Sequence, residues 1–423
     1  MRVLLLGSGG RESALARSLS DSALVESLFA LPGNPGIAPS AELLEGDPCD
    51  PAAVVDAARG VGADLVVVGP EAPLAAGVSE ALEDAGIAVF GPTSEAARIE
   101  SSKAFAKEVM AAARVRTARG RSFEDPAAAR SYLDRMPPPY VVKADGLAAG
   151  KGVVVTSEHG EAAAAVDDML SGKRFAAAGA RVLIEECLSG PEVSLIAVTD
   201  GRTVLPLAPA QDYKRARDGD RGPNTGGMGS YSPVPLCPED LAETVAQEMM
   251  KPVIDELARR GTPFVGALYA GLMLTEQGPK VLEFNARFGD PETQVILPRL
   301  QSDFGAVAYA AATGDLAGVS LSFRQDAAVC VVLASGGYPD DYRTGVPIQG
   351  VDDAESLPGI FVFHAGTKLK DGELVTAGGR VLAVTALGRG LAQARERAYR
   401  AASCVHFDGK QARSDIALVA QTG

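Results

Sequence analysis

Short apolar runs alternate with amphipathic segments through the first hundred residues, and this rhythm limits the possible folds of the chain more than any other feature. Strands are expected at the apolar runs, which span residues 2–6, 25–31, 64–68 and 87–90. Helices are expected between them, at residues 11–20, 51–59 and 74–85. Such alternation predicts a parallel sheet with helices on both faces. Ligands of these sheets bind beyond the carboxyl ends of the strands, at the loops that start here at Gly7, Pro32, Gly69 and Gly91.

The pattern changes after a helix expected at about residues 94–112. Short strands, a Gly/Ala-rich loop and one helix predict a small α+β lobe at about residues 117–188. A very polar loop at residues 212–229 and a helix at 238–260 precede two longer strands. From about residue 327 the chain is again rich in strands. We therefore expect a mixed α/β and α+β fold with three domains, at residues 1–101, 102–326 (containing the small lobe) and 327–423.

Composition excludes several classes of protein. The 423 residues carry 54 acidic and 40 basic side chains, a formal net charge of −14, whereas a nucleic-acid or membrane-surface binder needs a clustered basic face. The five cysteines form no C-x-x-C pair, which argues against a disulfide framework or zinc site and favours a reducing compartment. No run approaches the roughly 20 apolar residues of a membrane span, and the start MRVLLLGSGG lacks the features of a signal peptide. We expect a soluble cytoplasmic protein.

The first strand runs into the segment GSGGRES at residues 7–13. Its glycines allow close approach of the backbone to a ligand, and the helix that follows points its N–H groups at an anion. A dinucleotide fingerprint would need a third glycine where Glu12 stands, so NAD binding is not expected. Two interpretations stay open, a phosphate cradle or a tight turn that packs the helix on the sheet. Arg11 favours phosphate.

A second segment, KADGLAAGKG at residues 143–152, carries a lysine at each end of a Gly/Ala loop. It is not a Walker loop, because no Ser or Thr follows Lys151 and no helix begins there. A flexible loop with two cations suits a lid over a polyphosphate. The alternative is a hairpin loop with solvated lysines.

Two further segments give weaker signals. Adjacent carboxylates in IEECL at residues 184–188 are either surface charge or part of a hinge whose backbone reads adenine, with a nearby carboxylate on the ribose. The polar loop, residues 212–229, ends in PNTGGMG, where glycines expose backbone N–H groups to a ligand. Long loops of this kind inside compact domains are more often functional than not.

The most informative segment is KVLEFNARFGDPETQ at residues 280–294. Alternate residues of a strand share a face, so Glu283, Asn285 and Arg287 are expected to project together. Magnesium takes one or two protein oxygens and completes its shell with phosphates and water. The arginine can neutralise a transferring phosphoryl group. An edge strand with alternating polar residues is the alternative, and Asp290 and Glu292 directly downstream argue against it.

In this order, a lysine-bearing loop, a Glu-Glu hinge and an E-x-N-x-R strand resemble the ATP-grasp superfamily. The strings GSGGRES, GPEAPL, SKAFAK, VKADGLAAGKGV, GPNTGGMG and LEFNARFGDPETQ narrow the resemblance to the phosphoribosylamine–glycine ligase family. GYPDDYRTG, FHAGT and GGRVLAVTALG extend it through the last hundred residues. The likeness covers essentially the whole chain, up to Arg413-Ser-Asp-Ile416.

The resemblance implies a carbon–nitrogen ligase that joins glycine to 5-phosphoribosylamine at the expense of ATP. The products would be glycinamide ribonucleotide, ADP and phosphate, formed through glycyl phosphate in the second step of purine synthesis. It also implies Mg²⁺ or Mn²⁺ and a monomer that binds these small molecules, with no nucleic-acid or membrane partner.

The resemblance further assigns residues to roles. The metal would be held by Glu283 and Asn285, and the catalytic residues would be Arg287, Lys143 and Asp212. The ATP contacts would be Lys103, Lys143, Gly150, Lys151, Gly152, Glu185, Glu186, Cys187, Leu188, Glu192 and Lys214. The glycine and phosphoribosylamine contacts would be Gly9, Gly10, Arg11, Asn34, Glu71, Asp212, Asn224, Gly226, Gly227, Met228, Gly229, Arg287 and Asp290.

Four positions depart from the family pattern. Ser13 stands where the family usually has His, and Pro191 replaces the first member of a Glu pair. Ser101 and Asp340 stand where Gly is usual. Two other functions share part of this pattern, namely an ATP-grasp carboxylase that uses bicarbonate and a nucleotide-binding regulatory protein without catalysis. A carboxylase should lack the GPNTGGMG loop, and a regulatory protein should have lost Glu283, Asn285 or Arg287.

Overall fold

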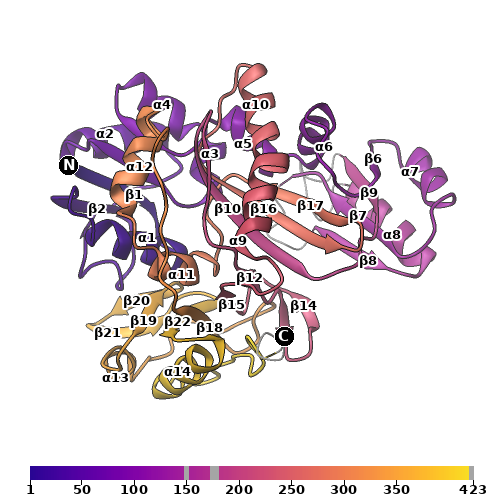
Figure 1. Ribbon diagram of the computed structural model, residues 1–423. Coiled ribbons are helices and arrows are strands. Elements are labelled where there is room, and N and C mark those ends of the chain that lie inside the picture. The colour runs from indigo at the N-terminus through magenta and orange to yellow at the C-terminus, as the bar shows by residue number, and fades with distance from the viewer. Residues whose placement is uncertain (147–151, 172–180, 419–423) are drawn as a thin grey trace.

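The computed structural model describes residues 1–146, 152–171 and 181–418 (Figure 1). The N-terminal domain is a five-stranded parallel sheet in the order β3-β2-β1-β4-β5. Its strands are β1 (Arg2–Gly7), β2 (Ser27–Pro32), β3 (Glu42–Leu43), β4 (Leu65–Val68) and β5 (Ala88–Phe90). The central strands are apolar on both faces because helices cover both, as Leu4 and Leu5 show by belonging to different core clusters. The predicted parallel sheet is confirmed.

Helices of this domain follow the predicted order with one break. They are α1 (Gly10–Ser20), α2 (Pro51–Val61), α3 (Glu71–Ala75), α4 (Val78–Asp84) and α5 (Ser94–Ser101). The single helix expected at residues 74–85 is wrong, because Gly77 takes a left-handed conformation with φ of +85° between α3 and α4. Asp50 caps α2 by accepting from the N–H groups of Ala52 and Ala53.

The helix expected at residues 94–112 is also divided in two. Helix α6 (Lys103–Ala112) starts after Ser102, whose extended backbone interrupts the helix. The Ser102 hydroxyl accepts from the N–H of Phe105 and so caps α6. This break places Lys103 in the first turn of a new helix.

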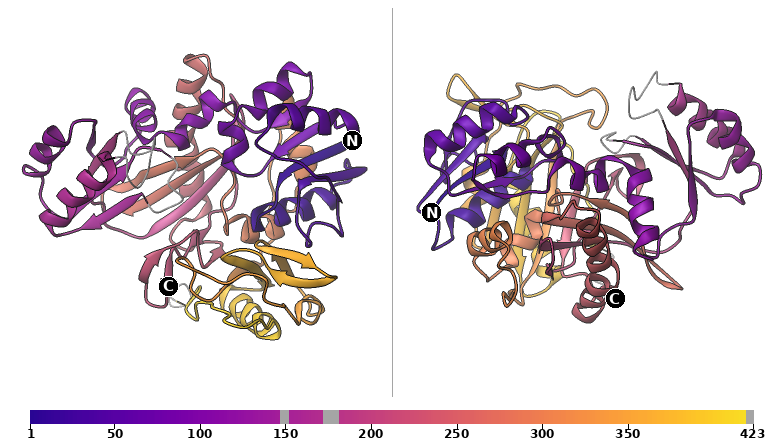
Figure 2. Two further views of the ribbon diagram at one scale, coloured as in Figure 1. Left: turned by 180° about the vertical axis from the view of Figure 1, so that it is seen from behind. Right: turned by 90° about the horizontal axis from the view of Figure 1, so that it is seen from above.

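The small lobe extends from the body in Figures 1 and 2. Its antiparallel sheet has the order β6-β9-β7-β8 and two helices on one face. The elements are β6 (Gly120–Phe123), α7 (Pro126–Leu133), β7 (Tyr140–Ala144), β8 (Val153–Thr156), α8 (His159–Leu170) and β9 (Val182–Glu186). Eleven buried residues form a core of its own, separate from the two clusters of the body, so the lobe is held together independently of the body's apolar packing.

A four-stranded antiparallel sheet in the order β11-β10-β16-β17 lies between the lobe and the N-terminal domain. Its strands are β10 (Glu192–Asp200), β11 (Val204–Pro206), β16 (Val265–Thr275) and β17 (Gly278–Asn285). Leu195 of β10 faces the cluster that contains helices α9 (Glu239–Val245) and α10 (Lys251–Arg259). A π-helical segment, η2 (Ala246–Met250), joins these two helices. Ile196 faces the opposite cluster, with helix α12 (Phe304–Thr313). Both faces of β10 are therefore buried.

The C-terminal sheet has the order β12-β15-β18-β22-β19 and recruits two strands from the polar loop. Its strands are β12 (Gln211–Asp212), β15 (Gly229–Ser232), β18 (Ala327–Ala334), β19 (Ile360–His364) and β22 (Arg380–Gly388). Helix α14 (Leu391–Cys404) packs against β18 and β22. The remaining elements are hairpins β13 (Arg215–Arg217) with β14 (Arg221–Asn224) and β20 (Thr367–Lys370) with β21 (Glu373–Thr376), and short helices α11 (Thr293–Ile296), η3 (Leu297–Arg299) and α13 (Val351–Glu355).

The polar loop was expected to lack regular structure, and that expectation is wrong. Residues 211–232 contain four short strands. β13 pairs with β14, and β12 pairs with β15, which also pairs with the distant strand β18. The domain boundaries stay a prediction, since the chain crosses between layers here and at α12.

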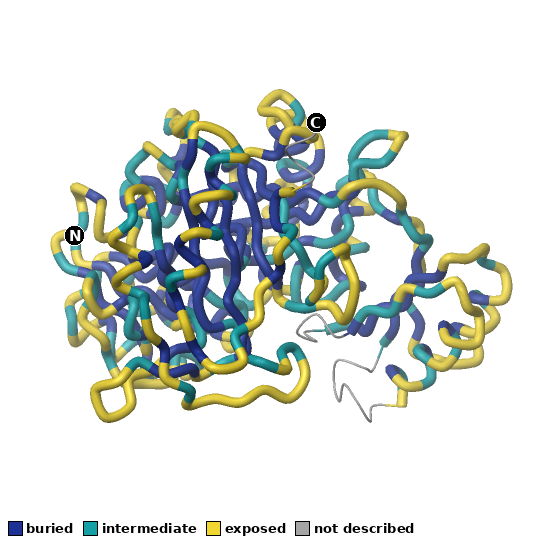
Figure 3. Tube along the Cα trace, turned by 90° about the horizontal axis from the view of Figure 1, so that it is seen from below, coloured by how far each residue is buried: buried dark blue, intermediate teal, exposed yellow. Residues whose placement is uncertain are grey.

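Figure 3 shows buried residues running along the strands of the body and exposed residues along the connections. None of the helices in the described ranges combines the length and the apolar character that crossing a bilayer requires.

Candidate active site

Strand β17 presents Glu283 and Asn285 on the face opposite its buried residues Val281 and Phe284. Strict alternation would put Val281 and Glu283 on one face. A register shift against β16 separates them, because Gly271 pairs with Glu283 while the next residue, Leu272, pairs with Val281. Such a bulge re-aims the side chains that follow it. The two predicted metal ligands therefore share a face by ordinary alternation, and the bulge places Val281 on the opposite face.

Glu283 stands among three cations from other segments of the chain and one, Arg287, from its own. Burial by itself would raise the pKa of the Glu283 carboxyl. The charges of Lys214, Lys143, Lys103 and Arg287 outweigh burial and hold that pKa below its ordinary value. The carboxylate is therefore kept ionised, as a magnesium ligand must be. The donors also fit the ion in type, a carboxylate and an amide oxygen on one strand.

Arg287 lies beyond the end of β17 and does not continue the strand. Its guanidinium pairs with Glu71 of α3 at 3.1 Å and with Glu100 of α5 at 3.0 Å. Burial opposes a charged arginine, but these two carboxylates raise its pKa above the ordinary value. The predicted alternation stops at Asn285, and Arg287 instead ties the strand end to two helices of the N-terminal domain.

A buried lysine and a half-buried one meet Glu185 at the base of the small lobe. The Lys143 ammonium of β7 lies 2.7 Å from one Glu185 oxygen, and Lys107 of α6 pairs with the other. Glu185 is 1% exposed. Its carboxylate is thus occupied by the two cations, and the adenine contact predicted for residues 185–188 would have to use the backbone of this strand end.

Lys103 donates to the carbonyl of Gly146 at 3.0 Å. Burial lowers the pKa of Lys103, although Glu283 opposes that shift. Gly152 closes the other side of the loop, with its carbonyl accepting from the Ala144 N–H at 2.8 Å. The predicted loop residues Gly150 and Lys151 lie outside the described residues.

The predicted hinge continues into β10. Arg119 donates to both oxygens of Glu186 at 3.0 Å, from its backbone N–H and its side chain. Cys187 and Leu188 are half-buried. Pro191 contributes its carbonyl to the N–H of Leu274 at 2.9 Å, and this contact does not depend on the side chain at position 191.

Asp212 and Lys214 flank the start of the polar loop. The Lys214 ammonium lies 2.6 Å from Glu192. Burial raises the pKa of Asp212 to about 7, with Glu292 and Glu192 adding to the shift and Lys214 opposing it. Asp212 and Glu192 raise the pKa of Lys214 well above its ordinary value despite burial. A carboxyl that titrates near neutrality beside a fixed cation is a candidate for proton transfer.

The glycine loop differs from its expected form. The N–H groups of Gly226, Gly227 and Met228 donate to Tyr338, Thr225 and Tyr213, at 3.2, 3.0 and 2.8 Å, and do not face outward. Gly227 has φ of +110°, and a Cβ there would lie 2.4 Å from Pro291. The glycines therefore permit close packing of the loop against residues 290–291. The Met228 side chain and Gly229 are buried, whereas Asn224 is exposed.

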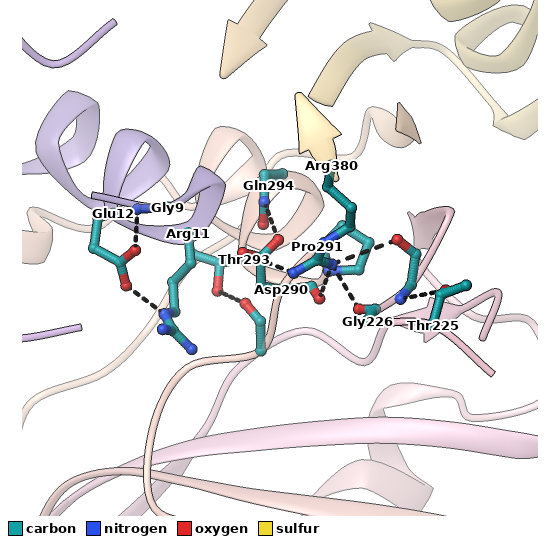
Figure 4. Close-up of polar contacts among 12 residues, drawn as sticks. Gly9, Arg11, Glu12, Thr225, Gly226, Asp290, Pro291, Thr293, Gln294 and Arg380 are labelled. Atoms are coloured by element: carbon teal, nitrogen blue, oxygen red, sulfur yellow. Dashed lines mark hydrogen bonds and ion pairs between the residues drawn. The ribbon is translucent and has the colours of Figure 1, made fainter. Parts of the chain in front are cut away.

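Asp290 lies where the N-terminal domain, the polar loop and the C-terminal sheet meet (Figure 4). Arg380, at the start of β22, donates to the carbonyls of Asp290 and Gly226 at 2.7 and 2.6 Å and pairs with the Asp290 carboxylate at 3.3 Å. Gln294 donates to the same carboxylate at 2.7 Å. Burial opposes ionisation, but Arg380 and Arg11 lower the pKa of Asp290. The predicted substrate residue Asp290 is thus held charged by a C-terminal arginine.

The first loop is organised by Glu12. Its carboxylate accepts from the Gly9 N–H at 2.6 Å and from the Arg11 side chain at 2.5 Å. A Cβ on Gly9 would lie 2.6 Å from Glu12, and one on Gly10 would lie 2.7 Å from the Gln294 amide. Both the phosphate cradle and the packing turn therefore remain consistent with the loop, and the glycines are required for packing in either case.

Ser13 and Asn34 connect this loop to the C-terminal domain. The Ser13 hydroxyl donates to the His364 carbonyl at 2.6 Å. The Asn34 amide donates to the carbonyls of Ser8 and His364 at 2.8 and 2.9 Å. Ser13, the departure from the family pattern, thus packs the first helix against the C-terminal sheet, and the Asn34 side chain is engaged within the protein.

Several residues of the site were not among the predicted ones. Glu292 is 3% exposed and accepts from Ser194 and Tyr269, each at 3.0 Å. Glu100, Lys107 and Arg380 contribute the other unforeseen charges. The strings SKAFAK and GGRVLAVTALG contain Lys107 and Arg380, but no local pattern shows which distant group a charge will meet. In the part of the chain that the structure describes, no three His, Cys, Asp or Glu side chains group to hold a metal by themselves.

Comparisons with known proteins agree with this arrangement. Residues 1–100, 101–293 and 328–419 match the N domain, the ATP-grasp (A) domain and the C domain of phosphoribosylglycinamide synthetase. A relative from Streptomyces coelicolor named phosphoribosylamine–glycine ligase is 55% identical over 99% of both chains. The crystal structure of phosphoribosylamine–glycine ligase from Thermotoga maritima has a TM-score of 0.87 and 36% identity, covering 98% of this chain and 100% of that one.

A biotin carboxylase domain from Hydrogenobacter thermophilus shares the fold alone. Its TM-score is 0.75 at 18% identity, over 97% of this chain and 91% of that one. The full-length matches at higher identity, together with the geometry above, decide the family. The chain belongs to the phosphoribosylamine–glycine ligase family of ATP-grasp enzymes.

Proposed function

We propose that this chain ligates glycine to 5-phosphoribosylamine and forms glycinamide ribonucleotide, ADP and phosphate, in the second step of purine synthesis. The observation that carries the proposal is the convergence of Lys103, Lys143, Lys214 and Arg287 around the ionised Glu283. An anionic triphosphate and a divalent cation satisfy such a mixed cluster. The names of the full-length relatives point to the same activity.

ATP would occupy the space between the lobe and the central sheet. Lys103 and Lys143 would contact its phosphates, and the backbone at Glu186–Leu188 would contact its adenine. Glu192 would contact the ribose, together with Lys214, with which it pairs. Glu283 and Asn285 would hold Mg²⁺ or Mn²⁺, which when bound neutralises phosphate charge. The loop at residues 146–152, including Gly150 and Lys151, would exclude water from the reacting groups.

The first chemical step is phosphoryl transfer. A glycine carboxylate oxygen forms a bond to the γ-phosphorus while the bond from that phosphorus to the ADP oxygen breaks. The chemistry needs mainly alignment and charge neutralisation. Lys143 and Arg287 would supply that charge, and the backbone of the glycine loop, residues 226–229, would shape the glycine pocket with Asn224 nearby.

The second step forms the amide. The amine of phosphoribosylamine bonds to the acyl carbon, the carbon–oxygen bond to phosphate breaks, and the nitrogen loses a proton. Asp212, whose pKa is raised to about 7, would accept that proton. The N-terminus of α1 at Gly9–Arg11 would take the sugar phosphate, with Glu71 and Asp290 at the rim and Asn34 holding the loop.

An ADP-release assay tests this function. Release should require glycine and phosphoribosylamine together, and release that ignores glycine but follows bicarbonate would establish the carboxylase alternative. Glu283→Ala should abolish turnover while leaving the unfolding temperature nearly unchanged. Glu373→Ala, on the exposed β20–β21 hairpin, is the matched control and should keep wild-type activity. We further propose that the protein is cytoplasmic and monomeric. Sedimentation at micromolar concentration would check the oligomeric state.

A further inference from the structure

Arg413, ten residues from the end of the chain, is the largest fully buried side chain in the described residues. Its guanidinium forms a two-bond pair with Asp415, at 2.7 Å for both bonds, and contacts Asp220 at 2.9 Å. It also donates to the Arg215 carbonyl at 3.1 Å and lies 4.7 Å from the centre of the Tyr213 ring. Three of these partners belong to the polar loop, about two hundred residues earlier in the chain.

The residues that follow Arg413 make further contacts with the same loop. The backbone N–H of Ser414 donates to Asp218 at 2.8 Å, and Asp415 accepts from the N–H of Gly219 at 2.8 Å. The N–H of Ala417 donates to the Tyr213 hydroxyl at 2.9 Å. We call residues 413–417 the C-terminal clamp. It contacts the β13–β14 hairpin at the turn, residues 218–220, and at Arg215, where β13 begins.

The hairpin cannot hold itself in place by apolar packing. Residues 221–224 of β14 are all exposed, and β13 has one half-buried residue between two exposed ones. An isolated two-stranded hairpin of this size is at best marginally stable in water. Its orientation must therefore come from contacts with other segments, and the clamp supplies charged and backbone contacts to β13 and to the turn at residues 218–220.

Tyr213, which the clamp contacts through its ring and its hydroxyl, stands between Asp212 and Lys214. We propose that Arg413 is a positioning residue for catalysis, and that the clamp fixes the backbone at residues 212–215 so that Asp212 and Lys214 are correctly placed in the active site. This inference rests on the proposed roles of Asp212 and Lys214. A displacement of about 1 Å in a positioning element can cost roughly a hundredfold in rate.

The surroundings of the clamp fit a fixed element. Arg395 of α14 donates to the carbonyls of Ser414 and Ile416, at 2.5 and 2.9 Å. Ile416 is fully buried, and a Cβ on Gly229 would lie 2.9 Å from its side chain. The clamp is thus anchored to the C-terminal domain on one side and meets both ends of the polar loop on the other.

The test compares Arg413→Met with Arg299→Met in the full-length protein. Arg299 is also buried, but it donates to Asp326, Arg324 and Ser232. Arg413→Met should lower kcat at least tenfold and raise hydrogen exchange in peptides covering residues 211–225. Arg299→Met should lower the unfolding temperature and leave kcat within about twofold. Wild-type kcat and exchange in a folded Arg413→Met protein would overturn the proposal.

A double-variant comparison separates this inference from the proposed function. If Arg413 acts through Lys214, adding Arg413→Met to Lys214→Met should lower kcat by less than twofold further. Full multiplication of the two effects would overturn the positioning role. If Lys214→Met alone kept wild-type activity, the proposed role of Lys214 would fail, while the exchange data would still report on the clamp. Tyr213→Phe, which removes only the hydroxyl, serves if Arg413→Met does not fold, and it should lower kcat severalfold; an unchanged kcat would count against the clamp.

Discussion

The two sides of the active site are built by different forces. Strand β17, with Glu283 and Asn285, is held by its opposite face, where Val281 and Phe284 pack into an apolar cluster of the body. The polar loop opposite, with Asp212 and Lys214, is held mainly by ion pairs and hydrogen bonds from Arg380 and the C-terminal clamp. Apolar burial is non-directional and insensitive to pH, whereas charge contacts depend on a few atoms. We therefore expect single substitutions far from the chemistry to be tolerated differently on the two sides.

Glu283→Gln should have the largest effect, because it removes the negative charge of the proposed metal ligand on strand β17. We expect kcat to fall by about 10³-fold, the upper range for loss of one electrostatic contact in an active site. The unfolding temperature should change little, because each cation near Glu283 keeps another partner. Lys143 keeps Glu185, and Lys214 keeps Glu192. Steady-state kinetics and thermal unfolding measure both. A variant with kcat near the wild-type value would mean that the metal site lies elsewhere.

Arg380→Met should come next, because it releases the glycine loop and Asp290 together. We expect kcat/KM for glycine to fall roughly a hundredfold, as positioning losses do. Lys368→Met, on exposed strand β20, is the control and should behave as wild type. Equal activity of both variants would show that the polar loop keeps its position without Arg380. The loop would then not depend on single charged contacts.

Asp212→Asn should change how stability depends on pH. The pKa of Asp212 is about 7 in the folded protein against an ordinary value of 3.8, so between these values the folded state holds more protons than the unfolded one. This group therefore makes the free energy of unfolding decrease as the pH rises from about 4 to 7. The variant should show a flatter profile in that window. Parallel profiles, measured by denaturant unfolding, would contradict the raised pKa.

Arg130→Ala should have the smallest effect. Arg130 pairs with Asp167 across the surface of the small lobe, where its side chain is 54% exposed. Exposed pairs contribute at most about 1 kcal/mol, and the lobe has its own apolar core. Activity should stay within about twofold of wild type. A larger loss would show that lobe surface charges take part in the site.

Some features of the fold and of the site could be predicted from local sequence. Apolar runs at residues 2–6 and 64–68 predicted buried parallel strands, and the E-x-N spacing predicted two oxygen ligands on one face. The helix breaks at Gly77 and Ser102 were missed because amphipathic spacing continues across both. The bulge at residues 281–283 was missed because it arises from pairing with β16.

The sequence by itself determined the strands of the N-terminal sheet, the family resemblance and the chemical types in the site, since these follow from periodicity and from short motifs. The tertiary structure alone decided which charges meet. Arg287 with Glu71, Lys143 with Glu185, and Arg413 with Asp220 join segments that are distant in the chain. Such pairings depend on how layers pack and not on residue spacing. That is why the roles of Arg380 and of the clamp became visible only in the folded protein.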